Sequence, residues 1–136
     1  MSSKGPFLFD SHALLKFFQR EPGHEQVARL LELAHRTKSQ KLLCAINLGE
    51  IIYATKRTFG DQKKIEILAH IERLGITILP VPNNLIFQAA EFKADYSISY
   101  ADCFALASAL EHKASIVTGD PEFRKVEHLV NIMWVG

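Results

Sequence analysis

Four acidic residues lie where predicted strands end or predicted helices begin, and they are the side chains best suited to chemistry: Asp10, Glu50, Asp102 and Asp120. Asp10 and Asp120 follow short apolar runs, whereas Glu50 and Asp102 occupy the first turns of two predicted helices. Carboxylates within a few Å of one another repel, so some must become protonated or a cation must bind between them. If the fold brings these acids together, they predict a metal site.

Two of these acids also have the spacing of helix-capping residues. Asn47 and Glu50, and likewise Ser99 and Asp102, have the spacing of a capping box, in which the acid reaches back to the amide of the cap residue. Asp102 is followed by the apolar Cys103, which a solvated cap does not need. Burying an unpaired charge is costly, so an acid in such surroundings indicates a compensating partner. Both interpretations stay open for these two acids.

The acids at the strand ends have the same structural alternative. Asp120 precedes Pro121, which favours an N-cap followed by proline at the first helical position, and Asp10 or Ser11 could cap the helix after the first strand. Taken singly, we favour capping for acids of this kind, because such caps are common. Taken as a set of four, they favour a binding site.

The order of the predicted elements indicates an α/β fold. Short apolar runs predict strands at residues 7–9, 42–46, 76–79, 115–118 and 130–135. Helical periodicity, together with breaks at glycine and proline, predicts helices at 13–18, 24–37, 47–60, 61–75, 83–96, 100–112 and 121–126. Asn47 and Asp61 are the expected caps of the third and fourth helices. Strands that alternate with helices and read as continuous apolar runs favour a parallel sheet covered on both faces.

That architecture predicts where the acids go. In an open parallel sheet, ligands bind beyond the carboxyl ends of the strands, near the point where the strand order reverses. Asp10 ends the first strand and Asp120 ends the fourth, and the helix that carries Glu50 directly follows the second. Asp102 comes after a helix and a loop, so the pattern alone places it less firmly.

Composition narrows the class of protein. The 136 residues predict a single domain, 1–136, and 48% hydrophobic with 23% charged residues is typical of a globular chain. A net charge of +1 excludes a broad basic field, so any nucleic-acid contact must rest on a local patch. Cys44 and Cys103 lack metal-ligand spacing, which favours a reduced, cytoplasmic protein. We expect no signal peptide and no membrane span.

The four acids stand in motifs that resemble those of PIN domains, and the order and spacing cover nearly the whole chain. The segments that carry the resemblance are Asp10-Ser11-His12-Ala13-Leu14-Leu15, Asn47-Leu48-Gly49-Glu50-Ile51-Ile52-Tyr53, Tyr96-Ser97-Ile98-Ser99-Tyr100-Ala101-Asp102 with its Ala-rich helix, and Thr118-Gly119-Asp120-Pro121-Glu122-Phe123. The pair Cys103-Phe104 departs from the more usual Ala-Leu type. The length looks most like that of VapC-type toxins.

The resemblance implies a PIN-like three-layer α/β/α fold with a central parallel sheet of about five strands, and an endoribonuclease that depends on Mg²⁺ or Mn²⁺. It implies Asp10, Asp102 and Asp120 nearest the metal, and Glu50 acting directly or through water. A metal-activated water would attack phosphorus in line. Ser11 and Thr118 are candidates for hydroxyls that orient the carboxylates, or for ordinary strand-end hydrogen bonding. Whether one metal or two bind stays open.

The resemblance also implies partners: an RNA substrate, a cognate antitoxin in a type II toxin–antitoxin pair, and a second copy in a homodimer. The main alternative is a catalytically inactive PIN-like module that binds a partner only; acids at all four positions argue against it. A phosphatase of similar strand order would need a second Asp where His12 stands. We leave His12 outside the predicted site and favour packing over base stacking for Trp134.

Overall fold

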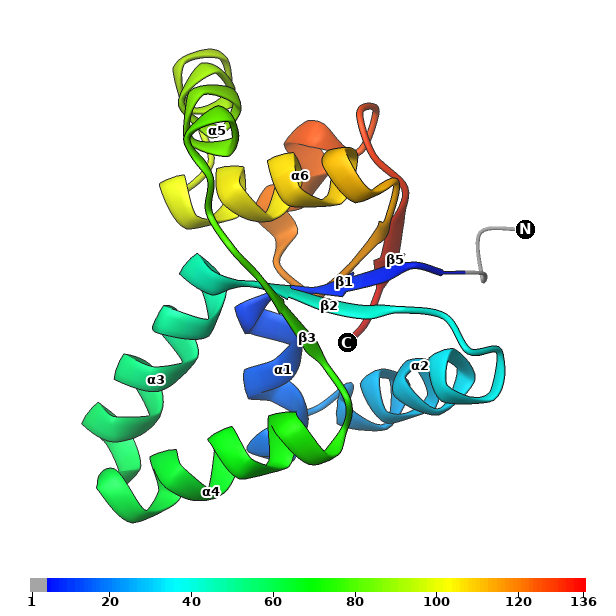
Figure 1. Ribbon diagram of the computed structural model, residues 1–136, viewed down its shortest axis with the longest axis vertical. Coiled ribbons are helices and arrows are strands. Elements are labelled where there is room, and N and C mark those ends of the chain that lie inside the picture. Colours follow the sequence, from blue (N-terminus) through cyan, green and yellow to red (C-terminus); the bar gives the residue numbers. More distant parts are fainter. Residues whose placement is uncertain (1–4) are drawn as a thin grey trace.

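The computed structural model describes residues 5–136 as one five-stranded sheet between two layers of helices (Figure 1). The strands are β1 (Phe7–Phe9), β2 (Lys41–Cys44), β3 (Thr77–Leu79), β4 (Ser115–Thr118) and β5 (Ile132–Trp134). The helices are α1 (Ser11–Phe18), α2 (His24–Arg36), α3 (Ala45–Phe59), α4 (Asp61–Arg73), α5 (Asn83–Asp95), α6 (Tyr100–His112) and the 3₁₀ helix η1 (Pro121–Val126). None of the described helices is long and apolar enough to cross a membrane.

The strand order determines where a site can form. The order is β3-β2-β1-β4-β5 and every neighbouring pair is parallel. The chain builds outward from β1 to β3, and then returns to the other side of β1 with β4 and β5. The strand order therefore reverses between β1 and β4, and the carboxyl ends of these two strands flank the position where open α/β sheets bind ligands. Phe9 pairs with Val117, so Asp10 and Thr118 leave the sheet side by side.

The alternation of side chains along the strands divides the core in two. Leu8 packs with buried residues of α5, α6 and η1, whereas Phe7 and Phe9 pack with those of α1, α2, α3 and α4. All three side chains are fully buried, as expected for a central strand covered on both faces. The predicted three-layer α/β/α fold with a parallel sheet of about five strands is confirmed.

The prediction for the start of α3 was wrong. Strand β2 ends at Cys44 rather than at residue 46, and Cys44, not Asn47, is the N-cap residue of α3. Asn47 is buried inside the helix, where its side chain has partners from elsewhere in the fold. Because Asn47 does not cap α3, the capping-box interpretation of Glu50 falls away.

Smaller differences concern other element ends. Gly60 occupies the N-cap of α4 and Asp61 is its first residue, so the predicted cap at Asp61 was wrong by one position. Strand β5 is shorter than the predicted 130–135, since only Ile132–Trp134 pairs with β4. Helix α6 begins and ends where the periodicity predicted, with the side chain of Ser99 accepting from the Asp102 amide.

Candidate active site at the carboxyl edge of the sheet

Asp10 lies at the carboxyl end of β1 and is held from two sides. Its Oδ1 accepts the Ala13 amide at 2.7 Å, which caps α1, and its Oδ2 accepts the Thr118 hydroxyl at 2.5 Å across the β1–β4 boundary. The same Thr118 Oγ1 accepts the amide of Asp120 at 3.0 Å. The capping and the site interpretations of Asp10 therefore describe one arrangement, in which Thr118 connects the two strand-end acids.

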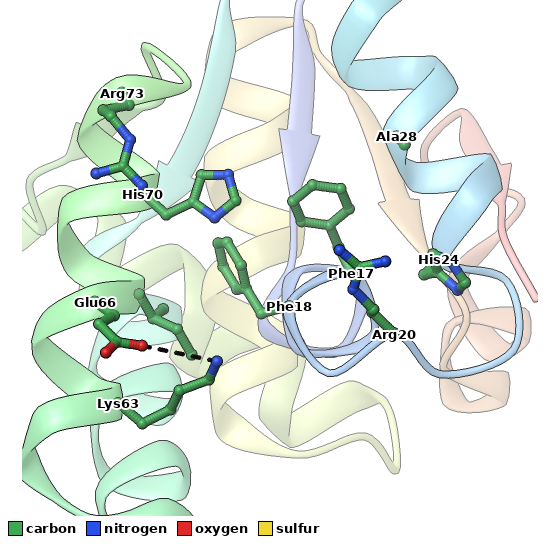
Figure 2. A pocket seen from close by; sticks show the side chains of 10 residues that line it. Phe17, Phe18, Arg20, His24, Ala28, Lys63, Glu66, His70 and Arg73 are labelled. Carbon is green, nitrogen blue, oxygen red and sulfur yellow. Dashed lines mark ion pairs between the residues drawn. The ribbon is translucent and has the colours of Figure 1, made fainter.

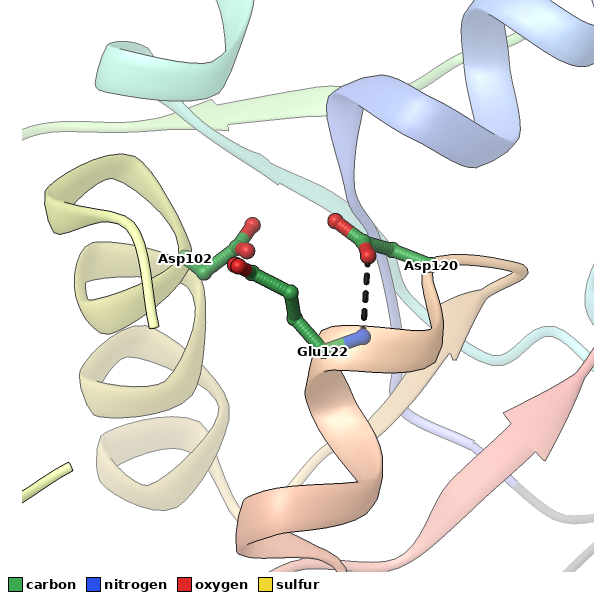
Figure 3. Close-up of side chains that lie close together, drawn as sticks. All are labelled: Asp102, Asp120 and Glu122. Atoms are coloured by element: carbon green, nitrogen blue, oxygen red, sulfur yellow. Dashed lines mark hydrogen bonds between the residues drawn. The ribbon is translucent and has the colours of Figure 1, made fainter. Parts of the chain in front are cut away.

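A cluster of three carboxylates faces this boundary. Asp102, Asp120 and Glu122 each offer an oxygen, and these oxygens lie within 4.8 Å of one another. Figure 3 shows Asp102 on α6 and Asp120 at the end of β4 pointing toward each other, and the Glu122 side chain reaching from η1 toward the carboxylate of Asp102. Asp120 also caps η1, because its Oδ1 accepts the Glu122 amide at 3.0 Å. Asp120 is thus both the N-cap of η1 and a member of this cluster.

Glu122 is the residue of this cluster that sequence reasoning missed. Its Oε1 accepts the backbone amide of Ser99 at 3.1 Å, the position that the acid of a capping box would occupy. Asp102 is therefore not the reciprocal partner of Ser99, and its carboxylate is free to face Asp120. The sequence does place this second acid two residues after Asp120, in the same motif at the end of the strand. Nothing in the local sequence, however, indicates that η1 turns the Glu122 side chain toward α6.

Glu50 approaches the site from α3. Its Oε1 accepts the hydroxyl of Ser11 at 2.7 Å and the amide nitrogen of Asn47 at 3.1 Å. Asn47 also donates to the carbonyl of Ala101 at 3.3 Å, directly before Asp102 in the chain. The Asn47 side chain thus joins the helices that carry two of the predicted acids, and the hydroxyl of Ser11 holds the carboxylate of Glu50.

The electrostatics of the site are those of crowded acids. Burial raises the pKa of Asp10 to about 7, with the nearby charges of Asp120 and Glu50 adding to the rise, while hydrogen bonds from Thr118 and Ala13 oppose it. Burial likewise raises the pKa of Asp102 to about 8, followed by the charges of Asp120 and Asp10. None of the ion pairs among residues 5–136 involves these acids. No ion pair in this part of the chain therefore offsets the charge of these acids.

The donor set fits a hard divalent cation. Mg²⁺ and Mn²⁺ prefer carboxylate oxygens, and Mg²⁺ is typically held by one or two carboxylates together with water and phosphate oxygens. Asp102, Asp120 and Glu122 provide three such oxygens in one place. Asp10 is close enough for the charge of Asp120 to act on it and for its own charge to act on Asp102, although it lies outside the group that satisfies the 4.8 Å separation.

His12 lies beside the turn that carries Asp120. Its Cε1 is 3.1 Å from the point where a Cβ on Gly119 would stand, and its buried Nδ1 has no hydrogen-bond partner among the described residues. Burial lowers the pKa of His12, and the charge of Lys16 lowers it further, so the ring is neutral near pH 7. The packing of α1 against the turn creates this proximity, and His12 lies outside the group of carboxylates.

A large cavity lies away from these acids. It has a volume of about 600 Å³ and lies between the end of α1, the start of α2 and one face of α4 (Figure 2). Phe17 and Phe18 form an aromatic wall with His70, while Arg20, Lys63 and Arg73 bring cationic groups and Glu66 a single acid. None of the predicted site acids lines it, so the cavity and the acidic cluster are separate features.

Comparisons with known proteins agree with this architecture. Among solved structures, the chain is similar to one from VapBC2 of Rickettsia felis bound to a promoter DNA fragment, with a TM-score of 0.79, 15% identity, and 96% of this chain and 98% of that one covered. It is similar to VapC20 of Mycobacterium tuberculosis, a toxin that cleaves the sarcin-ricin loop, with a TM-score of 0.72, 15% identity, and coverage of 89% and 95%. DNA-bound VapBC from Salmonella typhimurium gives a TM-score of 0.74, 15% identity, and coverage of 93% and 96%.

These similarities concern the fold, because the identities are low. A comparison with curated protein sequences finds no match. The family model for the PIN domain matches residues 7–129, from the first strand through η1, and so includes all of the acids described above. The resemblance that the four motifs predicted is confirmed, and the chain belongs to the PIN domain family.

Proposed function

We propose that this protein is a metal-dependent endoribonuclease and the toxin of a type II toxin–antitoxin pair. The observation that carries the proposal is the group of carboxylates from Asp102, Asp120 and Glu122, whose oxygens lie within 4.8 Å of one another beside Asp10. Membership of the PIN family and the fold shared with VapC20, described as a sarcin-ricin loop cleaving toxin, support it. Free, buried Cys44 and Cys103 are compatible with a reducing cytoplasm.

The residues have distinct roles in this proposal. Asp102 and Asp120 hold the cation together with Asp10, and Glu122 is a further oxygen donor. A bound divalent cation would supply positive charge to the phosphate oxygens and lower the pKa of an attacking water. Glu50 acts from α3, oriented by Ser11 and Asn47.

The remaining role belongs to Thr118. It holds Asp10 and the Asp120 amide in one geometry, so that the strand-end acids do not need to reorganise when the substrate binds.

Because the helices on both faces pack against one sheet, we also propose that the chain forms a single domain.

The antitoxin is the proposed protein partner, and the large cavity is the surface that fits it. Phe17 and Phe18 provide an apolar wall, and the cationic side chains of Arg20, Lys63 and Arg73 surround it. An acidic amphipathic segment of the antitoxin would complement both features.

A homodimer is a further proposal. Phe87 on α5 is 72% exposed and supplies apolar surface for it. Light scattering of the wild type and of Phe87→Glu tests whether the chain forms a dimer through this surface.

Cleavage of RNA with and without metal tests the proposed activity. Wild type should cleave single-stranded RNA in Mg²⁺ or Mn²⁺ and stop when a chelator is added. Asp120→Asn, which keeps the size of the side chain and removes its charge, should lower the rate by about a hundredfold or more. Metal-independent cleavage, or an Asp120→Asn variant as active as wild type, would contradict the assignment of the site.

The same samples discriminate the alternative, a PIN module that binds a partner without catalysis. A functional metal site predicts that Mn²⁺ raises the melting temperature of wild type, because a ligand that binds only the folded state stabilises it. An inactive module predicts no cleavage and no thermal shift, with partner binding intact.

A further inference from the structure

A second surface lies at the same edge of the sheet, on the other side of the Asp120 turn from the carboxylates. It is a pocket of about 330 Å³, which we call the Arg124 pocket, and it is lined by Gln26, Gly119, Pro121, Arg124, Trp134 and the C-terminal Val135-Gly136. Trp134 pairs in register with Thr118, so this pocket is one strand outward from the acids. Its volume is near the lower end of the ~300–1,000 Å³ range of small-ligand pockets, which suits a single nucleotide unit.

The 3₁₀ geometry of η1 places the acids and the pocket on separate faces. A 3₁₀ helix has about three residues per turn, so residues three apart share a face. Phe123 is fully buried in the core, Glu122 faces Asp102, and Pro121 and Arg124 together line the pocket. One short helix therefore directs an anionic side chain to the site and a cationic one to the neighbouring surface.

Arg124 is presented outward by Trp134. The Cζ of its guanidinium lies 4.5 Å from the centre of the Trp134 ring, and its side chain keeps 65% of its exposure. Trp134 is partly buried and packs against the core cluster that contains Leu8. The nearest acid is Glu127, whose oxygen is 3.9 Å away in an exposed pair that is too weak to neutralise the guanidinium. Trp134 thus supports a charged group whose other side is open to solvent.

We propose that Arg124, supported by Trp134, contacts a nucleotide that flanks the scissile phosphate of single-stranded RNA. The proposal rests on the proposed ribonuclease function. The Arg124 pocket borders the Asp120 turn through Gly119 and Pro121, so an RNA chain whose phosphate lies at the carboxylates can reach the pocket with an adjoining nucleotide. A guanidinium can both stack on a base and donate to phosphate oxygens, and an aromatic support reduces the freedom it loses on binding. In an acidic site, this cation supplies the attraction for RNA that the catalytic carboxylates cannot.

RNA binding without cleavage tests this contact directly. The background is Asp120→Asn, and the probe is a fluorescein-labelled single-stranded RNA of about 12 nucleotides, within the site sizes that such surfaces cover. Adding Arg124→Ala should weaken binding about tenfold or more and make it less dependent on salt. Arg124→Lys should lose part of the affinity, because it keeps the charge and loses the planar stacking group. Arg36→Ala, an exposed arginine at the end of α2 and thus at the opposite edge of the sheet, is the matched control.

Steady-state cleavage kinetics give a second measurement, which would not change in this way if Arg124 had only a structural role. In the otherwise wild-type protein, Arg124→Ala should raise KM by a similar factor with a smaller change in kcat, and the Mn²⁺-induced melting shift should stay unchanged. RNA binding equal to that of the Asp120→Asn parent would overturn the contact while leaving the ribonuclease proposal intact. Loss of binding to a co-expressed protein partner, with RNA binding unchanged, would assign the surface to that partner and overturn it too. Absence of all RNA binding and cleavage would overturn both proposals.

Discussion

Thr118 donates its hydroxyl to Asp10 across 108 positions of sequence, and with the same oxygen accepts the amide of Asp120. Both Thr118 and Asp10 are almost fully buried. The two strand-end acids therefore share one hydroxyl as their structural support, and the β1–β4 pairing is what brings that hydroxyl within reach.

Removing this hydroxyl should affect stability and the site together. Thr118→Val keeps the shape of the side chain but leaves the Asp120 amide and one oxygen of Asp10 without their partner. Unsatisfied buried groups cost about 1–3 kcal/mol each, so we expect a loss of that order in the free energy of unfolding. Urea denaturation measures it, and the Mn²⁺-induced melting shift should shrink in parallel. Thr118→Ser, which retains the hydroxyl, should preserve the melting shift; equal losses in both variants would contradict this role.

The raised pKa values of Asp10 and Asp102 predict how the metal-free protein responds to pH. Folding raises these pKa values from 3.8 to about 7 and about 8, so the folded state binds more protons than the unfolded state between those limits. The contribution of these two groups to the free energy of unfolding is therefore complete below their pKa in the unfolded state, 3.8. It is lost as the pH rises through their pKa values in the folded state. In a chelator, the free energy of unfolding should decrease between about pH 5 and about pH 8.

The matched variant for this pH dependence is Asp10→Asn, which cannot ionise and should flatten the decline. Adding Mn²⁺ to wild type should flatten it as well, because a cation stabilises the charged carboxylates. If the stability of the metal-free wild type instead rises between about pH 5 and about pH 8, folding does not raise the pKa values of Asp10 and Asp102.

Glu122 combines a structural contact with a charge, and two substitutions separate them. Glu122→Gln keeps an oxygen to accept the Ser99 amide and removes the charge, whereas Glu122→Ala removes both. If Glu122 is an oxygen donor for the metal, both variants should weaken Mn²⁺ binding, by about tenfold or more. Only Glu122→Ala should also lower the free energy of unfolding, by about 1 kcal/mol. Titration calorimetry with Mn²⁺ and urea denaturation give the two quantities, and unaltered Mn²⁺ affinity in Glu122→Gln would limit Glu122 to its contact with α6.

Gly119 is required by close packing at the turn. A Cβ at this position would stand 2.6 Å from the carbonyl oxygen of Val135, a backbone atom that cannot move aside cheaply. Gly119→Ala should therefore destabilise the protein, by about 1–3 kcal/mol, and displace the adjacent Asp120. Gly49→Ala is the matched control, because nothing lies within 4 Å of its Cβ position inside α3, and alanine favours a helix by about 0.5–1 kcal/mol. Thermal denaturation of both variants, with and without Mn²⁺, should give changes of opposite sign.

Much of the fold follows from local patterns in the sequence. The apolar runs and helical periodicity were sufficient to predict every strand and helix, because burial on one or two faces repeats along the chain with the period of the element. The acids at strand ends were also predictable, since parallel strands place their carboxyl ends at one edge. The capping and the chemical interpretations of Asp10 and Asp120 turned out to be compatible, because the same side chain caps a helix and faces the site.

Only the tertiary structure decided which acids meet. Asn47 looked like a cap in sequence, yet its amide group bonds Glu50 and Ala101, a partner 54 positions away. Glu122 joins Asp102 because η1 packs against the start of α6. A local pattern records which side of its own element a residue occupies. The neighbours across a strand order of β3-β2-β1-β4-β5 depend on how the whole chain closes, and that information is spread over contacts too distant in sequence for any periodicity to contain.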